Sequence, residues 1–257
     1  FVRPGGVLED VPEGITAYIR ELLPDVRKGT SEMETIVAQN PIFKARFKDV
    51  GVLSLSALMA LGQTGPAVKA AGLPWDLRKS QPYCGYEGYE FDVPVYDKSD
   101  AYNRAMVRFD ECYQSLRIVY QALDKLDATE GEPVMVEDKK IAWPARLSIS
   151  TDGQGTAPVH VREIMTESME SLIHHFKLVT EGFRVPAGQA YSVVEHAKGV
   201  LGCHLVSSGG TRPYRAHISD PGFRNLQGLS MMAEGGMLAD AIVCLAAIDP
   251  VMGGVDR

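Results

Sequence analysis

The sequence predicts a mainly helical α+β fold in which two long helices form the core and a small antiparallel β meander lies near the C-terminus. Residues 100–126 place apolar side chains three and four positions apart, the spacing of an amphipathic helix. Residues 159–182 repeat that spacing. After Pro186 the apolar residues alternate with polar ones, which indicates short strands at residues 190–195, 200–206 and 213–218.

Composition excludes several classes of protein. The 257 residues are 45% hydrophobic and 23% charged, proportions typical of a soluble globular domain. The net charge is −7 without a run of Lys or Arg, which argues against nucleic acid as a partner because phosphate binding needs a basic surface. No apolar stretch reaches the ~20 residues that a membrane-spanning helix needs. The N-terminal residues do not show the basic segment followed by an apolar one that is typical of a secretion signal.

The four cysteines lie far apart and form no C-x-x-C motif, so they predict neither a zinc site nor an iron–sulfur site. We expect reduced, buried thiols in a cytoplasmic setting. These residues are Cys84, Cys112, Cys203 and Cys244.

Short helices are predicted in the first part of the chain after an extended entry. One begins after Pro12 and is expected to stop at Pro24, because proline cannot continue a helix. A second covers residues 31–39 and is expected to close at the Asn40–Pro41 pair. The class of residues 43–50 is not decided by their pattern.

Two further helices and a long loop complete residues 1–99. Helices over residues 54–61 and 66–71 are each followed by a glycine suited to end a helix, Gly62 and Gly72. The loop, residues 73–99, contains three prolines and six aromatic residues among acidic ones. A loop of this length is often functional or docked. Contact with a partner and packing on the chain's own body both remain open here.

The amphipathic helix at residues 100–126 carries Arg104, Arg108, Glu111 and Arg117 mostly off its apolar stripe. A polar connector follows, from Asp127 to Thr156, which we interpret as a surface excursion.

The C-terminal segment, residues 235–257, ends in an unusual way. Its apolar block is predicted to be a helix that ends near Asp249, since Pro250 cannot continue it. The tail beyond carries Asp256 and Arg257, and it forms either a solvated end or the floor of a buried site. From the residues alone we expect a solvated end, because chain termini are usually loose.

The residue patterns predict this architecture but not a reaction. Eight sequence segments together resemble those of a known family. They span the whole chain in order, and the chain resembles the D subunit family of respiratory NADH-quinone oxidoreductase, complex I. The segments are RPGG (3–6), PWDLRK (74–79), YEFDVPV (89–95), QSLRI (114–118), SMESLIHHFKL (168–178), TEGFRVPAG (180–188), GGTRPYR (209–215) and VDR (255–257).

The resemblance is to the C-terminal half of that subunit, and Phe1 in place of an initiator Met also favours a fragment. The His and Tyr thought to hold the quinone headgroup belong to the other half, so no counterpart is assigned here. We expect residues 1–257 to be part of one domain with three segments. These are residues 1–99 with short helices and the aromatic loop, 100–182 with the long helices and an inserted loop at 127–158, and 183–257 with the meander, the last helix and the tail.

The family in turn resembles the large subunit of [NiFe] hydrogenases, which ends in a D-P-C-x-x-C-x-x-H pattern. This chain keeps Asp249 and Pro250 but has Val251, Gly254 and Arg257 at the three ligand positions. A nickel site needs thiolates, which Val and Gly cannot supply. The resemblance implies a hydrogenase-like helical core whose vacated metal cavity forms part of an inner quinone chamber.

Asp249, Val251, Gly254 and Arg257 are therefore expected to line that chamber, and Asp249 or Asp256 to hold charge or relay protons. The resemblance favours a buried, chamber-lining tail in the intact subunit.

It also implies a function, a location and partners. The subunit would position quinone to accept electrons from a terminal iron–sulfur cluster in a neighbouring subunit, within a proton-translocating NADH-quinone oxidoreductase. Quinone is the expected substrate, and flavin and clusters are expected in other subunits, with none bound by this chain.

The location would be peripheral, on the cytoplasmic side of the cell membrane, against other complex I subunits and the membrane arm. The fragment alone is expected to be inactive. The alternatives are a docking scaffold without chemistry and a hydrogenase-type metalloenzyme.

Overall fold

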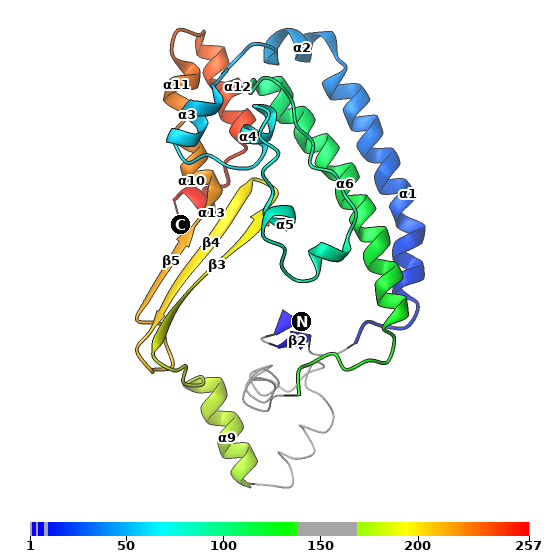
Figure 1. The fold of residues 1–257 in the computed structure, drawn as a ribbon, viewed down its shortest axis with the longest axis vertical. Helices are drawn as coiled ribbons and strands as arrows, with labels where there is room; N and C mark the ends of the chain where they lie inside the picture. The colour runs from blue at the N-terminus through cyan, green and yellow to red at the C-terminus, as the bar shows by residue number, and fades with distance from the viewer. Residues whose placement is uncertain (1, 4, 8–9, 138–168, 257) are drawn as a thin grey trace. The chain divides into compact units, whose positions relative to one another are not determined.

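A computed structural model of the chain describes residues 2–3, 5–7, 10–137 and 169–256 (Figure 1). It forms two compact units, which are considered separately. Unit 1 comprises Phe1–Ile15, Leu126–Ala190 and His204–Ala216, and unit 2 comprises Thr16–Lys125, Tyr191–Cys203 and His217–Arg257. Helices predominate and the sheet is small and antiparallel, so the predicted mainly helical α+β class is confirmed.

The expectation that a helix stops at Pro24 is wrong. Helix α1 (Ile15–Met33) continues through this proline and leads into a π-helical turn, η1 (Glu34–Ala38). A proline inside a helix costs about 3 kcal/mol. Packing offsets that cost, because Leu23 is buried with Leu116 and Leu123 of the next long helix. The apolar face of α1 therefore overrides the local breaker.

The Asn40–Pro41 pair begins a helix as well as following one. Helix α2 (Pro41–Phe47) starts at the proline, and the Asn40 side chain accepts a hydrogen bond from the Ile42 N–H at 2.8 Å. Proline suits the first helical position because its missing N–H would be unpaired there. The undecided residues 43–50 thus belong largely to α2.

The two short helices that follow are confirmed. Helix α3 (Leu55–Ala60) begins at Ser54, whose hydroxyl accepts from the Ala57 N–H. Helix α4 (Pro66–Ala70) begins directly after Gly65, which has a φ of 72°. A Cβ on Gly65 would lie 2.6 Å from the Gly199 Cα. This close approach requires glycine and brings the start of α4 against a turn of the β-sheet.

The aromatic loop packs on the chain's own body. It contains α5 (Leu77–Ser80) and the 3₁₀ turn η2 (Tyr86–Gly88), and it lies along α6 (Ala101–Ala128). The Gln121 side chain bonds both the N–H and the carbonyl of Glu90, and the Tyr96 hydroxyl donates to Asp110 at 2.6 Å. Phe91 is buried. Packing on α6 is therefore the arrangement that the structure supports.

The remaining elements follow the predicted order. Helix α9 (Met169–Thr180) is the described part of the second long helix, and residues 159–168 lie outside the described residues. So does most of the predicted inserted loop, from residue 138 onward. Strands are ordered β3-β4-β5 in one sheet, and a separate β1–β2 pair lies near the N-terminus. The strands are β1 (Val2–Arg3), β2 (Gly6–Val7), β3 (Gly188–His196), β4 (Gly199–Ser207) and β5 (Arg215–Ser219).

Four helices close the chain. Gly228 separates α10 (Pro221–Leu226) from α11 (Leu229–Ala233). Helix α12 (Leu238–Ile248) ends where predicted, at Asp249, which adopts the left-handed conformation with φ 57° and ψ 58°. A last turn, α13 (Met252–Val255), follows Pro250. The elements are coloured along the chain in Figure 1.

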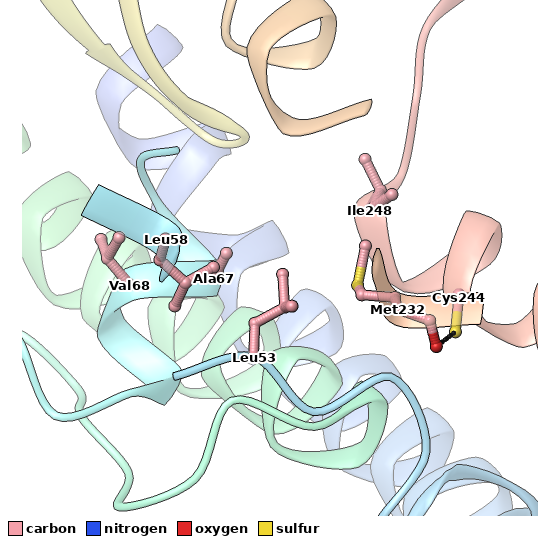
Figure 2. Packing of buried hydrophobic residues seen from close by; sticks show 7 residues of the cluster. All are labelled: Leu53, Leu58, Ala67, Val68, Met232, Cys244 and Ile248. Atoms are coloured by element: carbon pink, nitrogen blue, oxygen red, sulfur yellow. Dashed lines mark hydrogen bonds between the residues drawn. The ribbon is translucent and has the colours of Figure 1, made fainter. Parts of the chain in front are cut away.

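The main core of unit 2 joins the short helices to the C-terminal ones. Figure 2 shows its seven buried side chains, among them Leu58, Val68 and Cys244. Cys244 is thus a buried free thiol as expected, but Cys84 and Cys112 are exposed and the expectation for them is wrong. Cys84 adopts φ 50° in the aromatic loop, and Cys112 lies on α6 outside the buried positions of that helix.

Candidate functional site

A buried lysine organises a cluster of charges in unit 2. Lys69 of α4 is 1% exposed, and its Nζ contacts three carboxylates. The distances are 3.0 Å to Asp76 Oδ2, 2.6 Å to Glu111 Oε1 and 3.2 Å to Glu195 Oε1. Burial opposes the charge on Lys69, but these carboxylates outweigh it and raise the pKa of the ammonium. Lys69 is therefore a charged centre that joins α4, α5, α6 and β3.

Asp76 fixes the start of α5 within this cluster. Its Oδ1 accepts from the Arg78 N–H, as a helix cap does, and the Arg78 guanidinium donates to both carboxylate oxygens at 3.0 and 2.8 Å. Burial opposes ionisation of Asp76, yet the bonds from Arg78 and the charge of Lys69 prevail and lower its pKa to about 2. Asp76 is thus held as a carboxylate.

The pKa of Glu195 is shifted in the opposite direction, upward. This residue comes from β3, and its Oε2 accepts from the Leu77 N–H at 3.1 Å while its own N–H donates to the Tyr83 hydroxyl. Burial raises the pKa of Glu195, and the nearby Asp76 adds to this, although Lys69 acts against both. The cluster holds three carboxylates against the two cations Lys69 and Arg78. Glu195 is the member of the cluster most disposed to take up a proton.

A cavity of about 310 Å³ opens beside the cluster, and it is called the polar cavity here because most of its lining residues are polar or charged. Elements far apart in the sequence share its walls, since α6, β3 and the residue after α12 all contribute to it. Its lining residues are Arg78, Arg108, Glu111, Cys112, Ser115, Glu195, His196, Ala197 and Asp249.

Arg108 stands at the wall of this cavity with an incomplete set of partners. Its terminal nitrogens donate to the backbone carbonyls of Arg104 at 3.1 Å and Ala247 at 2.9 Å. The second bond places a cation at the C-terminal end of α12, where it complements the helix dipole. The Nε is buried and finds no partner among the described residues. Burial lowers the pKa of Arg108, and the nearby Asp249 carboxylate opposes that shift.

A second cavity, of about 320 Å³, adjoins the same wall and is largely apolar. Phe43 and Phe47 stack with their ring centroids 3.9 Å apart and line it together with small alanines. Arg108, Cys112 and Asp249 line both cavities. An apolar slot with a cation and a carboxylate in its wall has the usual form of a small-molecule site.

The structure describes three of the four residues predicted to line a chamber. Asp249 lies at the wall just described, and its carboxylate pairs with Lys198 Nζ at 3.1 Å. Val251 caps α13 and is 50% exposed. A Cβ on Gly254 would lie 2.5 Å from the Asp220 carboxylate, so glycine is required for that approach. Arg257 lies outside the described residues.

Sequence reasoning did not single out Lys69, Arg108, Glu111 or Glu195. Each carried a signal of its own. Lys69 lies in an otherwise apolar stretch between two glycines, an unusual place for a charge, and Glu195 follows two valines at the end of a predicted strand. Arg108 and Glu111 are three positions apart on α6 and thus share a face. The polar face of α6 is partly buried, with Arg104 only 2% exposed.

Two further findings concern metals and membranes. Within residues 2–3, 5–7, 10–137 and 169–256, no group of three or more His, Cys, Asp and Glu side chains is arranged to hold a metal ion. Over the same part of the chain, every helix is too short or too polar to cross a membrane.

Comparison with known proteins gives a consistent match. The family model of the respiratory-chain NADH dehydrogenase 49 kDa subunit matches residues 1–257. Over the whole chain, identity is 58% to the D subunit of NADH-quinone oxidoreductase from Nocardioides sp. and 59% to a D subunit of the same enzyme from Streptomyces avermitilis. The chain covers 58% and 57% of those two proteins. It thus spans somewhat more than half the length of the curated relatives it matches.

The charge cluster predicts a specific pH dependence of stability. Asp76 has a folded-state pKa of about 2 against 3.8, so its ionised form stabilises the folded protein above pH 4, by about 2 kcal/mol. This contribution is lost as the pH falls from 4 toward 2. Asp76→Asn should therefore lower the free energy of unfolding at pH 7, and its difference from wild type should shrink at pH 3. Chemical unfolding at both pH values measures it.

Asp92→Asn is the matched control, because Asp92 pairs with Arg117 on the surface. It should change the unfolding free energy by less than ~1 kcal/mol at either pH. An Asp76→Asn effect that is equal at pH 7 and pH 3 would contradict the assignment of a lowered pKa.

Proposed function

Because this chain belongs to the family of the 49 kDa subunit of respiratory-chain NADH dehydrogenase, we propose that it forms one wall of the quinone chamber of an NADH-quinone oxidoreductase. In this proposal it positions quinone to accept electrons from a terminal iron–sulfur cluster carried by a neighbouring subunit. The flavin and the clusters belong to other subunits. The quinone-headgroup ligands contributed by the rest of the subunit complete the chamber.

The observation that carries the proposal is the wall shared by the two cavities. Asp249, which the family resemblance assigns to the chamber, lies there with Arg108 between an apolar slot and a polar cavity. A quinone headgroup has the matching chemistry, a flat apolar ring with carbonyl oxygens at its ends. Phe43, Phe47 and the alanines suit the ring, and the Arg108 guanidinium at the wall suits a carbonyl oxygen.

Reduction of quinone to quinol takes two electrons and two protons. Negative charge develops on the quinone oxygens as electrons arrive, and a preorganised guanidinium stabilises that charge in a water-poor site. Arg108 has this role in the proposal. Protons reach the oxygens from the polar side of the wall, where Asp249, His196 and Glu195 line the cavity. Glu195, whose pKa burial raises, is the natural proton store there.

Location and partners follow from the same membership. We infer a peripheral place on the cytoplasmic side of the cell membrane, in a complex with other subunits and a membrane arm. The fragment alone is expected to be inactive, because it contributes only part of the chamber. A site of the hydrogenase type is not favoured, since Val251 and Gly254 supply no thiolate.

A docking scaffold of the same complex is the second candidate. It is favoured by the apolar face of α12, where Leu238 is 88% exposed and Ile242 is also exposed. Large apolar side chains left in solvent on one face mark surfaces that other protein covers. Docking and a chamber wall are compatible, and activity measurements on the intact complex separate them.

Changing Val251 tests the tail. In the intact complex, Val251→Trp should lower quinone reductase activity or alter sensitivity to quinone-site inhibitors, because a bulky side chain narrows the chamber. NADH oxidation with an artificial electron acceptor should be spared. If both activities persist unchanged, Val251 does not line the chamber.

Changing Arg108 tests the wall itself. Arg108→Gln should lower quinone reductase activity of the intact complex roughly 100- to 1,000-fold, as loss of one donor to a developing anion does elsewhere. Arg117→Gln, on the exposed side of α6, is the matched control and should retain activity. Assembly is checked by NADH oxidation with the artificial acceptor. Wild-type quinone reduction by an assembled Arg108→Gln complex would remove Arg108 from the proposal.

A further inference from the structure

A third cavity lies in unit 2 and has a separate lining. Its volume is about 600 Å³, within the range of small-molecule sites. It contains neither Arg108 nor Asp249, so it is distinct from the proposed chamber wall. Most of its surface is apolar, with the half-exposed Trp75 as one wall. It is lined by Met59, Gly62, Gln63, Thr64, Val68, Leu73, Pro74, Trp75 and Arg224.

Two polar residues of the lining are engaged within the protein. The buried Gln63 amide donates to the Asn225 carbonyl at 3.1 Å. The Thr64 N–H donates to the Asn225 side chain at 3.3 Å, and the Thr64 hydroxyl accepts from the Val200 N–H at 3.0 Å. These bonds hold the shape of the cavity, and they direct the polar groups of Gln63 and Thr64 toward protein partners.

Arg224 differs from them. One of its terminal nitrogens donates to the Val200 carbonyl, but its Nε is buried and has no hydrogen-bond partner among the described residues. It also forms no ion pair with any residue of the described ranges. A guanidinium keeps its charge in proteins. An anion bound beside this cation would gain a charge-assisted hydrogen bond.

We propose that this cavity binds a small amphiphile with an apolar body and one carboxylate, such as a medium-chain fatty acid. The carboxylate pairs with the Arg224 guanidinium, and the apolar chain lies against Trp75, Leu73 and Val68. Charge complementarity selects the anion, because a neutral alcohol or carbonyl leaves the guanidinium uncompensated. The proposal does not depend on the quinone assignment.

Photo-crosslinking in the assembled complex tests the site. The probes are dodecanoate and dodecanol, each carrying a diazirine on the chain, with crosslinks located by peptide mass spectrometry. Dodecanoate should label the segment from Met59 to Trp75 much more than dodecanol does. Arg224→Gln should lower the labelling by dodecanoate roughly tenfold, and Arg224→Lys, which keeps the charge, should retain most of it.

Two controls keep the outcome decisive. Arg117→Gln removes an arginine elsewhere on unit 2 and should leave the labelling unchanged. Met59→Trp, at an exposed rim position, should block the cavity and reduce labelling while leaving Arg224 intact, and it serves where Arg224→Gln prevents assembly. Equal labelling by acid and alcohol, no labelling of this segment, or labelling indifferent to Met59→Trp would each overturn the proposal.

Discussion

The ammonium of Lys69 is the interaction on which the candidate site depends. Four elements distant in sequence converge on one buried charge, since Asp76 precedes α5, Glu111 belongs to α6 and Glu195 belongs to β3. A buried cation is tolerated only when its partners are fixed around it. The glycine contact between Gly65 and Gly199 brings α4 and the sheet close enough for this to happen. The polar cavity and the positions of its walls follow from that convergence.

Helix α6 connects this charge cluster to the end of the chain. Arg104, Arg108 and Glu111 recur at four- and three-residue intervals and share one face of the helix. Arg104 bonds the carbonyls of Gly51 and Ser99, Arg108 bonds that of Ala247, and Glu111 bonds Lys69. One polar face thus secures a loop, the last turn of α12 and α4. It also places Arg108 and Asp249 at the same cavity wall, which is the wall of the proposed chamber.

Helix ends and strands can be predicted from the sequence where short-range interactions alone determine them. The cap at Ser54, the end of α12 before Pro250 and the three strands follow from short-range rules. The predicted helix end at Pro24 is wrong because the packing of α1 on α6 outweighs one lost hydrogen bond. Within the site, Asp249 is named through the family resemblance, and its role in a chamber stays a prediction. Lys69 and Glu195 are not predictable from the sequence, because their pairing joins residues 126 positions apart and no local pattern encodes it.

The central claim is that Lys69 balances its carboxylates and thereby holds the site together. Chemical unfolding of the subunit with Lys69→Met, alone and combined with Glu195→Gln, tests this most directly. The single change should cost about 3–5 kcal/mol of unfolding free energy, because it strands buried carboxylates. The double variant should be roughly 1–2 kcal/mol more stable than the single one, since one of those charges is removed. A Lys69→Met subunit as stable as wild type, or a double variant less stable than the single one, would contradict the account.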